Sequence, residues 1–223
     1  MPVHAHVFDA VVLAGGRGSR LGGADKPGLV VGRQTLLGSV ISAVISAGAA
    51  RVVVVGPERQ PALTPGTGGQ AGGPGAGAAR VRYAQEDPPG RGPAAALRCG
   101  LAEVSAPAVV LAAADLPFLR PAHVTGLLAS LAGQAGPGVV PLDASGRPQW
   151  LASCWYLAAL RGALHGYAGS SLRALLGPLD PLLLPDETPA GEPPPWLDCD
   201  TADDLRRARD WAARMGSEQE AAR

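Results

Sequence analysis

Short apolar runs alternate with helix-like patterns along the first 131 residues of the chain. The runs at residues 10–14, 52–55 and 109–113 consist of Ala, Val and Leu, which is typical of strands buried on both faces. Helical patterns follow them at residues 35–47, 93–103 and 121–131. This alternation predicts a mostly parallel sheet with right-handed crossovers and helices on both faces.

The second half of the chain carries weaker signals. We expect further strands at residues 80–84, 138–141 and 150–155, with a turn at Ser145 and Gly146. Short helices are expected at residues 158–164 and 170–176. We expect a mixed sheet that is mostly parallel and contains an antiparallel strand.

A final helix is expected at residues 202–215, because Thr201 is a good N-cap and acidic residues follow it. Residues 57–79 are rich in Gly and Pro and predict a flexible surface loop, and residues 216–223 predict a frayed tail. The expected fold class is α/β: a single-domain, Rossmann-like three-layer sandwich with a doubly wound sheet. Its core spans about residues 8–215.

Composition narrows the function classes. The 19 basic and 19 acidic side chains give a formal net charge of zero, which disfavours a nucleic-acid partner. No signal peptide or membrane-length apolar stretch is seen, and three widely spaced cysteines predict buried thiols rather than disulfides or a zinc site. We expect a cytoplasmic protein without a membrane partner; a monomer fits the sequence, which leaves the oligomeric state open.

A glycine-rich, basic segment follows the first expected strand. A loop of this kind lets main-chain N–H groups approach a polyphosphate while Arg17, Arg20 and Lys26 offset its charge. It is not a Walker loop, because Gly23 is followed by Ala and Asp where Lys and Ser or Thr are needed. The dinucleotide fingerprint also fails, because Leu21 stands where the third glycine belongs.

The segment from Leu13 to Pro27 reads Leu-Ala-Gly-Gly-Arg-x-x-Arg-Leu-Gly-x-x-Asp-Lys-Pro. It resembles the signature loop of nucleotidyltransferases, and most closely that of the molybdenum cofactor guanylyltransferase (MobA-like) family. Later segments are similar to that family in order and spacing: residues 92–101, 114–119, 147–149 and 197–205. The resemblance covers nearly the whole chain, from about residue 10 to residue 209.

The resemblance implies an activity. Such an enzyme moves GMP from GTP onto a molybdopterin-type phosphate with release of pyrophosphate, and it uses Mg²⁺ as cofactor. It also implies nucleotide contacts at the glycine loop, at the start of the helix near residue 93, and at Lys26 and Asp115. The loop and helix residues concerned are Leu13, Ala14, Gly15, Gly16, Arg17, Gly92 and Pro93.

The chemistry of the charged residues can be argued independently. Asp115 directly follows an apolar strand, and open α/β sheets bind ligands at the carboxyl ends of their strands. We therefore expect Asp115 to hold magnesium, although a turn-capping role before Pro117 is the alternative. Lys26 and Arg20 are expected to neutralise charge in the transition state. Arg17 can equally be a solvated loop charge.

Asp198 and Asp200 lie one residue apart and would point to one side of a strand. Asp200 is expected to be a second magnesium ligand, although it can instead help to cap the last helix. In the guanylyltransferase family these two positions are usually Asn. The Asp-x-Asp-Thr sequence is more similar to cytidylyltransferases and phospholactate nucleotidyltransferases.

Asp87 is the candidate for base recognition. A carboxylate that accepts from N1–H and an exocyclic amine favours guanine over adenine, and Asp87 sits where the family's guanine-reading Asp would be. Cytosine also offers an amine, and Asp-Pro-Pro-Gly can simply form a turn.

Four alternatives stay open: a CTP-using molybdopterin cytidylyltransferase, a transferase for another phosphorylated acceptor, a sugar-1-phosphate nucleotidyltransferase, and a non-catalytic nucleotide-binding regulatory module.

Overall fold

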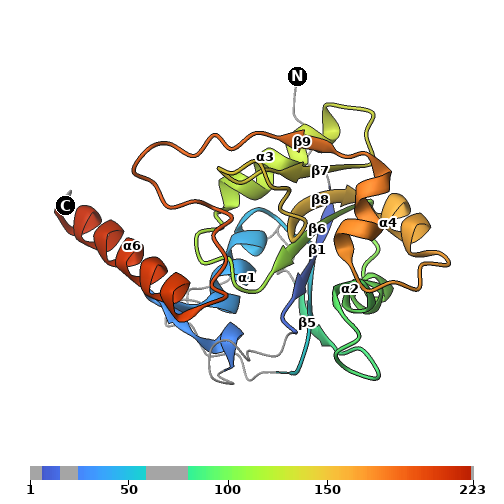
Figure 1. Cartoon of the computed structure of the whole chain (residues 1–223), viewed down its shortest axis with the longest axis horizontal. Coiled ribbons are helices and arrows are strands. Elements are labelled where there is room, and N and C mark those ends of the chain that lie inside the picture. Colours follow the sequence, from blue (N-terminus) through green and yellow to red (C-terminus); the bar gives the residue numbers. More distant parts are fainter. Residues whose placement is uncertain (1–6, 16–24, 59–79, 222–223) are drawn as a thin grey trace, which may run out of the picture.

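A seven-stranded sheet forms the centre of the computed structural model, which describes residues 7–15, 25–58 and 80–221 (Figure 1). The strand order is β5-β4-β1-β6-β8-β7-β9. The strands are β1 (Phe8–Leu13), β4 (Arg51–Val55), β5 (Arg80–Ala84), β6 (Ala108–Ala113), β7 (Gly138–Pro141), β8 (Ala152–Tyr156) and β9 (Leu182–Leu184). β8 runs antiparallel to both of its neighbours and all other pairs are parallel, so the mostly parallel sheet with an antiparallel strand is confirmed.

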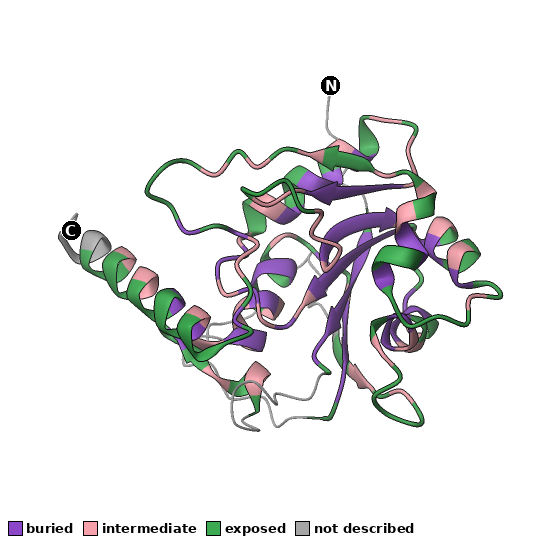
Figure 2. Cartoon of the chain, in the orientation of Figure 1, coloured by how far each residue is buried: buried purple, intermediate pink, exposed green. Residues whose placement is uncertain are grey.

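Helices cover both faces of the sheet, as Figure 2 shows by the buried strands between them. On one face Ala10 and Val12 of β1 pack with α1 (Leu36–Ser46) and α3 (Pro121–Ala132). On the other face Val11 and Leu13 pack with α2 (Pro93–Ala102), α4 (Leu157–Leu164) and α5 (Leu172–Leu176). The side chains of alternate residues in β1 therefore pack into two different cores, one on each face of the sheet. This explains why nearly all of β1 is apolar.

The carboxyl ends of three parallel strands meet at one edge of the sheet. Leu13 is in register with Val55 of β4 and with Ala113 of β6. Backbone hydrogen bonds extend this pairing past the strand ends, from Ala14 N–H to the Val55 carbonyl at 2.8 Å and from Ala114 N–H to the Leu13 carbonyl at 3.0 Å. The glycine loop and Asp115 therefore start from neighbouring points on the same edge.

A smaller unit lies beside this edge. It comprises the short helix η2 (Lys26–Gly28), the hairpin of β2 (Val30–Val31) and β3 (Gln34–Thr35), and α6 (Ala202–Ala221), which projects from the body in Figure 1. A third buried cluster joins hairpin and helix: Val31, Leu36, Phe118, Cys199, Leu205 and Ala208. The C-terminal segment is thereby held against the segment that carries Lys26.

Several element predictions need correction. Residues 216–221 continue α6 instead of fraying, and β9, β2 and β3 were not predicted. β8 starts at Ala152 and not at residue 150, because Trp150 and Leu151 belong to the turn before it. The helix expected at 170–176 starts at Leu172, because the Ser171 side chain caps it. Of the expected loop at 57–79 only Pro57 and Glu58 are described, and both are exposed.

Among the described helices, none has the length and apolar character needed to span a bilayer.

Candidate active site

Three segments far apart in the sequence meet at the Lys26 ammonium group. Lys26 Nζ donates a hydrogen bond to Asp200 Oδ1 at 2.5 Å and forms an ion pair with Asp115 Oδ2. The Asp115 and Lys26 side chains are 14% and 18% exposed, whereas that of Asp200 is 49% exposed. The cluster is therefore open to solvent on the Asp200 side and enclosed on the Asp115 side.

Asp115 is positioned by the turn that follows β6. Leu116 and Phe118 are buried on either side of Pro117 and anchor this turn in two different cores. Asp115 Oδ2 pairs with Lys26, but Oδ1 is buried and has no hydrogen-bond partner among the described residues. A buried carboxylate oxygen without a donor is costly. This oxygen is available to a cation or to a ligand donor.

Lys26 is positioned by the short helix η2. Pro27 in its first turn fixes the backbone there, and Asp25 is its N-cap residue. The Leu36 N–H donates to the Leu29 carbonyl at 2.9 Å, which ties the chain after η2 to the start of α1.

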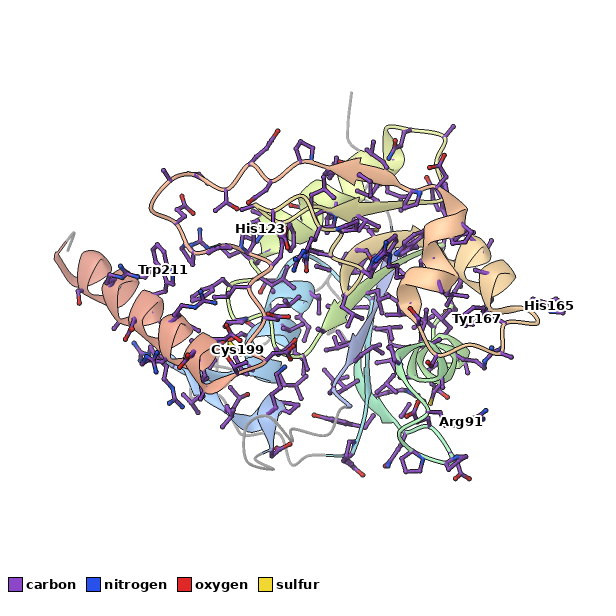
Figure 3. All side chains as sticks on the ribbon, viewed as in Figure 1. Arg91, His123, His165, Tyr167, Cys199 and Trp211 are labelled. Carbon is purple, nitrogen blue, oxygen red and sulfur yellow. The ribbon has the colours of Figure 1, made fainter. Side chains whose placement is uncertain are left out.

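Asp198 and Asp200 flank Cys199, which is fully buried in the cluster that contains Phe118 and Val31. Figure 3 shows Cys199 close to the start of α6. Next in the chain, Thr201 and Asp204 form the expected cap: Asp204 N–H donates to Thr201 Oγ1 at 3.1 Å, and Thr201 N–H donates to Asp204 Oδ2 at 2.9 Å. The buried thiol and the cap fix the backbone from which Asp200 reaches Lys26.

Residues 197–200 form no strand, so the arrangement in which Asp198 and Asp200 share one side does not depend on a strand. The alternation of exposed and buried positions nevertheless holds, with both carboxylates outward and Cys199 inward. A partner strand is not needed for this pattern, because the buried thiol alone fixes which way the segment faces.

The electrostatics of the cluster are dominated by crowded carboxylates. Burial alone would lower the pKa of Lys26, but its contacts with Asp115 and Asp200 raise that pKa above its ordinary value. Desolvation and the nearby carboxylates of Asp200 and Asp115 raise the pKa of Asp198. Lys26 is thus held as a cation between groups that repel one another.

The donor set suits a hard divalent cation that also binds substrate phosphates. Within the described ranges no group of three or more His, Cys, Asp or Glu side chains is arranged to hold a metal alone. Magnesium, however, is usually held by one or two carboxylates together with phosphates. Asp115, with its unpartnered buried Oδ1, and Asp200, across the ammonium group, fit that arrangement.

Of the nucleotide-binding candidates, Leu13, Ala14 and Gly15 lie at the end of β1, with Leu13 and Ala14 buried and Gly15 exposed. Gly56 follows β4 with φ 153°, and a Cβ there would come within 2.9 Å of the Ala14 backbone. The chain thus approaches the start of the glycine loop closely. The other predicted loop residues, Gly16, Arg17 and Arg20, lie outside the described residues.

Gly92 and Pro93 form the start of α2. Gly92 has φ 97°, and a Cβ there would lie 2.8 Å from Ser170 Cβ. The Ala94 N–H donates to the Ser170 carbonyl at 3.1 Å. The glycine at position 92 is therefore explained by a close contact between the start of α2 and the chain before α5.

Asp87 is exposed in the loop after β5, and its bond to Pro88 is cis. Its neighbour Glu86 organises this loop, because Glu86 Oε1 accepts from the Gly90 N–H at 2.6 Å and the Arg91 N–H at 3.1 Å. Asp87 stands on the same sheet edge as Asp115, and no described contact joins it to the Lys26 cluster.

Two positioning residues were missed by sequence reasoning. Glu86 was not singled out from the sequence, although its carboxylate holds the loop after β5 through the Gly90 and Arg91 N–H groups. Cys199 was expected only to be a buried thiol, which is confirmed for Cys199 and Cys154, whereas the same prediction is wrong for Cys99, which is only partly buried. The place of Cys199 between two aspartates was the available signal that it orients them.

A parallel α/β sheet with a lysine and aspartates at the carboxyl edge, next to a glycine loop, is the arrangement of a nucleotide-using transferase. The chain belongs to the family described as the MobA-like NTP transferase domain, whose model matches residues 10–182. The resemblance proposed from the sequence is therefore confirmed, and the protein is an enzyme of the nucleotidyltransferase class.

Solved structures share the fold. Molybdopterin-guanine dinucleotide biosynthesis protein A from Archaeoglobus fulgidus is 21% identical, with a TM-score of 0.66 over 92% of this chain and 99% of that chain. The 2-C-methyl-D-erythritol 4-phosphate cytidylyltransferase from Thermus thermophilus is 22% identical, with a TM-score of 0.59 over 93% and 99%. Rv0371c from Mycobacterium tuberculosis, in complex with manganese, is 24% identical, with a TM-score of 0.61 over 92% and 98%. A search of curated proteins found no match.

Proposed function

We propose that the protein transfers GMP from GTP to a molybdopterin-type phosphate, with Mg²⁺ as cofactor and release of pyrophosphate. The observation that carries this proposal is the Lys26 ammonium group between Asp115 and Asp200, at the edge where the glycine loop leaves β1. Membership of the MobA-like family supports nucleotidyl transfer. The likeness to a molybdopterin-guanine dinucleotide biosynthesis protein supports the choice of substrates.

The reaction needs no covalent nucleophile from the protein. A terminal phosphate is mostly dianionic at neutral pH, since its second pKa is about 6. One of its oxygens attacks the α-phosphorus, the new P–O bond forms, and the bond to the β-phosphate breaks as pyrophosphate leaves. No proton has to be removed from the acceptor, so catalysis is alignment and charge neutralisation.

Lys26 and the backbone N–H groups after β1 supply that neutralisation from the protein itself. The ammonium group lies on a short helix fixed by Pro27, so its approach to phosphate oxygens is preorganised. Asp115 and Asp200 would hold the magnesium ion. The bound ion would polarise the phosphate oxygens and stabilise the charge of the leaving pyrophosphate. A structure of Rv0371c with manganese supports a divalent ion in this fold.

CTP is the second candidate donor, because Asp198 and Asp200 stand where Asn is usual in guanylyltransferases. The likeness to a cytidylyltransferase supports it as well. Both GTP and CTP are compatible with Asp87 as the base-reading carboxylate, since guanine and cytosine each have an amino group that can donate a hydrogen bond to it. We also propose a cytoplasmic location, which the three free cysteines support.

The test is to assay each of the four nucleoside triphosphates with Mg²⁺ and molybdopterin and to measure the rate of pyrophosphate release. Asp115→Asn should lose transfer and keep the same far-ultraviolet circular dichroism and thermal midpoint. Arg206→Gln is the matched control, because Arg206 lies on α6 and forms an ion pair with the nearby Asp203. A higher rate with CTP would overturn the guanylyl assignment. Binding of nucleotide without any turnover, in wild type as in Asp115→Asn, would indicate a regulatory module instead.

A further inference from the structure

Residues 185–201 (the C-terminal connector) join β9 to α6 without forming a helix or a strand. Figure 1 shows this long segment running from β9, at the edge of the sheet, to the start of α6. Asp200 stands near its end and makes the contact with Lys26. Connecting segments are more mobile than helices and strands, so the position of Asp200 depends on what anchors the connector.

Apolar side chains anchor the connector just before it enters the site. Pro193 and Pro195 are buried, and Trp196 packs against the core that lies under α1 and α3. The next residue, Leu197, packs instead against the third buried cluster, which joins the hairpin to α6. Proline also restricts the backbone at its own position and at the position before it. The stretch that leads into the site is therefore stiff.

His123 of α3 is the side chain that meets Trp196. The centroids of the two rings are 5.6 Å apart, and the ring planes are inclined at 57°. Aromatic rings prefer such tilted arrangements, with centroids about 4.5–7 Å apart. His123 and Trp196 are both partly buried, so the contact is shielded from water on part of its surface.

The same histidine closes the start of α3. His123 Nδ1 accepts a hydrogen bond from the Arg120 N–H at 3.1 Å, and the His123 N–H donates to the Arg120 carbonyl at 3.0 Å. Arg120 ends the turn that follows β6 and carries Asp115. One imidazole ring thus contacts both the end of the turn that carries Asp115 and the connector that carries Asp200.

An ion pair joins the same two segments. Arg120 Nη1 and Glu192 Oε2 lie 3.1 Å apart, but the two side chains are 42% and 48% exposed. An ion pair this open to water contributes little to stability. The contact between His123 and Trp196 is therefore the stronger of the two, and Glu192 offers a control on the same connector.

Building on the proposed function, in which Asp115 and Asp200 hold the divalent ion, we propose that His123 and Trp196 are positioning residues for nucleotidyl transfer. Their ring contact fixes the connector against the start of α3 and so sets the position of Asp200 relative to Asp115. Both rings act through Asp200 and not on the substrates. Residues that orient metal-binding side chains are typically worth about 10–100-fold in metal affinity or activity.

Lys26 is the only lysine in the sequence, so labelling with ¹⁵N-lysine gives a single ammonium signal in the NMR spectrum. The exchange of its protons with water reports the contact between Lys26 and Asp200 without nucleotide or metal. Trp196→Ala and His123→Gln should speed this exchange toward the rate of Asp200→Asn. Unchanged exchange in Trp196→Ala and His123→Gln would overturn the assignment.

Two controls isolate the ring contact. His123→Gln keeps a side-chain acceptor for the Arg120 N–H, so it removes the ring and leaves the cap of α3. Glu192→Gln removes the exposed ion pair on the connector and should exchange as wild type does. Faster exchange in Glu192→Gln than in His123→Gln would assign the positioning to the ion pair and overturn the role of the rings.

A series of Mg²⁺ concentrations separates positioning from a loss of folded protein. Trp196→Ala and His123→Gln should need about tenfold or more Mg²⁺ for half-maximal transfer, and excess Mg²⁺ should restore part of the rate. Trp196→Phe keeps an aromatic ring against His123 and should lie close to wild type. A loss by the same factor at every Mg²⁺ concentration, or a Trp196→Phe as impaired as Trp196→Ala, would overturn the assignment.

The two proposals fail in different ways. If no nucleoside triphosphate supports pyrophosphate release, the proposed function is wrong, and the exchange of the Lys26 protons still decides whether the rings position Asp200. If transfer proceeds and both ring variants keep the wild-type dependence on Mg²⁺, the positioning role is wrong and the proposed function stands.

Discussion

Lys26 Nζ and Asp200 Oδ1 lie 2.5 Å apart although 174 positions separate the two residues in the chain. Asp115 pairs with the same ammonium group, so one cation joins η2, the end of β6 and the segment before α6. In this arrangement the ammonium group fills the space between two carboxylates that a divalent ion would also fill. We therefore expect Lys26 and a divalent metal ion to compete for the carboxylates of Asp115 and Asp200. This competition should end when phosphate oxygens bind the ammonium group.

Lys26→Met should separate these two effects. Nucleotidyl transfer should fall by about 10²–10³-fold, the usual cost of losing one group that stabilises transition-state charge. Binding of Mn²⁺ without nucleotide, followed by electron paramagnetic resonance, should become tighter, because the competing cation is gone. Lys26→Arg keeps the charge and should leave Mn²⁺ binding weak. Weaker Mn²⁺ binding in Lys26→Met than in wild type would contradict the competition.

The two C-terminal aspartates should differ in importance. Asp200→Asn removes a carboxylate that contacts Lys26 directly, whereas Asp198 acts on the cluster only through longer-range charge. We expect Asp200→Asn to lower transfer and to raise the Mg²⁺ concentration needed for half-maximal rate more than Asp198→Asn does. Rates measured across a Mg²⁺ series would decide, and a larger effect of Asp198→Asn would assign the metal contact to Asp198 instead.

The layered fold could be predicted because its signals are local. Continuous Val and Leu runs show strands buried on both faces, and β1 does feed one core with Val12 and the other with Val11. The hairpin of β2 and β3 could not be found this way, since each strand has two residues and is held by the distant α6. The Arg209 Nε hydrogen bond to the Val30 carbonyl at 3.0 Å shows that long-range support.

The sequence predicted which residues belong to the candidate site, but it predicted only part of how they are arranged in space. Asp115 and Lys26 could be placed at the same edge, because parallel strands end together and both residues follow such ends. Their direct pairing, with Asp200 on the same ammonium group, depends on the buried cluster that holds both Cys199 and Phe118, and no sequence spacing encodes that cluster.

The loop after β5 should control base choice through Asp87 and loop shape through Glu86. Asp87→Asn should lower the ratio of kcat/KM for GTP over ATP by about tenfold or more, since one charged acceptor is lost. Glu86→Gln should instead weaken binding of every nucleotide, because the Gly90 and Arg91 N–H groups lose their ionised acceptor. An unchanged GTP/ATP ratio in Asp87→Asn would remove Asp87 from base recognition.

Two helical glycines should respond to alanine in opposite directions. A Cβ at Gly100 of α2 would lie 2.5 Å from Val11 Cγ1 and 3.0 Å from Val55 Cγ2, so Gly100→Ala overpacks the core and should cost about 1–3 kcal/mol. Gly126 of α3 has nothing within 4 Å of an added Cβ, and Gly126→Ala should stabilise the protein by about 0.4–1 kcal/mol. Urea denaturation of both variants measures the difference, and a stabilising Gly100→Ala would contradict the close packing of α2 on β1.

His123 should make the free energy of unfolding depend on pH. Burial and the nearby Arg120 lower the pKa of His123 below its ordinary 6.5, outweighing the opposite effect of Glu192. His123 Nδ1 accepts from the Arg120 N–H at 3.1 Å, and its ring lies 5.6 Å from that of Trp196, so the neutral form is the one that the fold stabilises. The unfolded chain then binds a proton that the folded chain does not, and stability falls as pH drops below 6.5.

His123→Gln keeps an acceptor for the Arg120 N–H but does not titrate. Urea midpoints at pH 7.5 and pH 5.5 should therefore differ less in His123→Gln than in wild type. His165→Gln is the matched control, because His165 is exposed at the end of α4, and it should keep the wild-type difference. Equal pH dependence in all three proteins would mean that His123 is not held neutral by its contacts with Arg120 and Trp196.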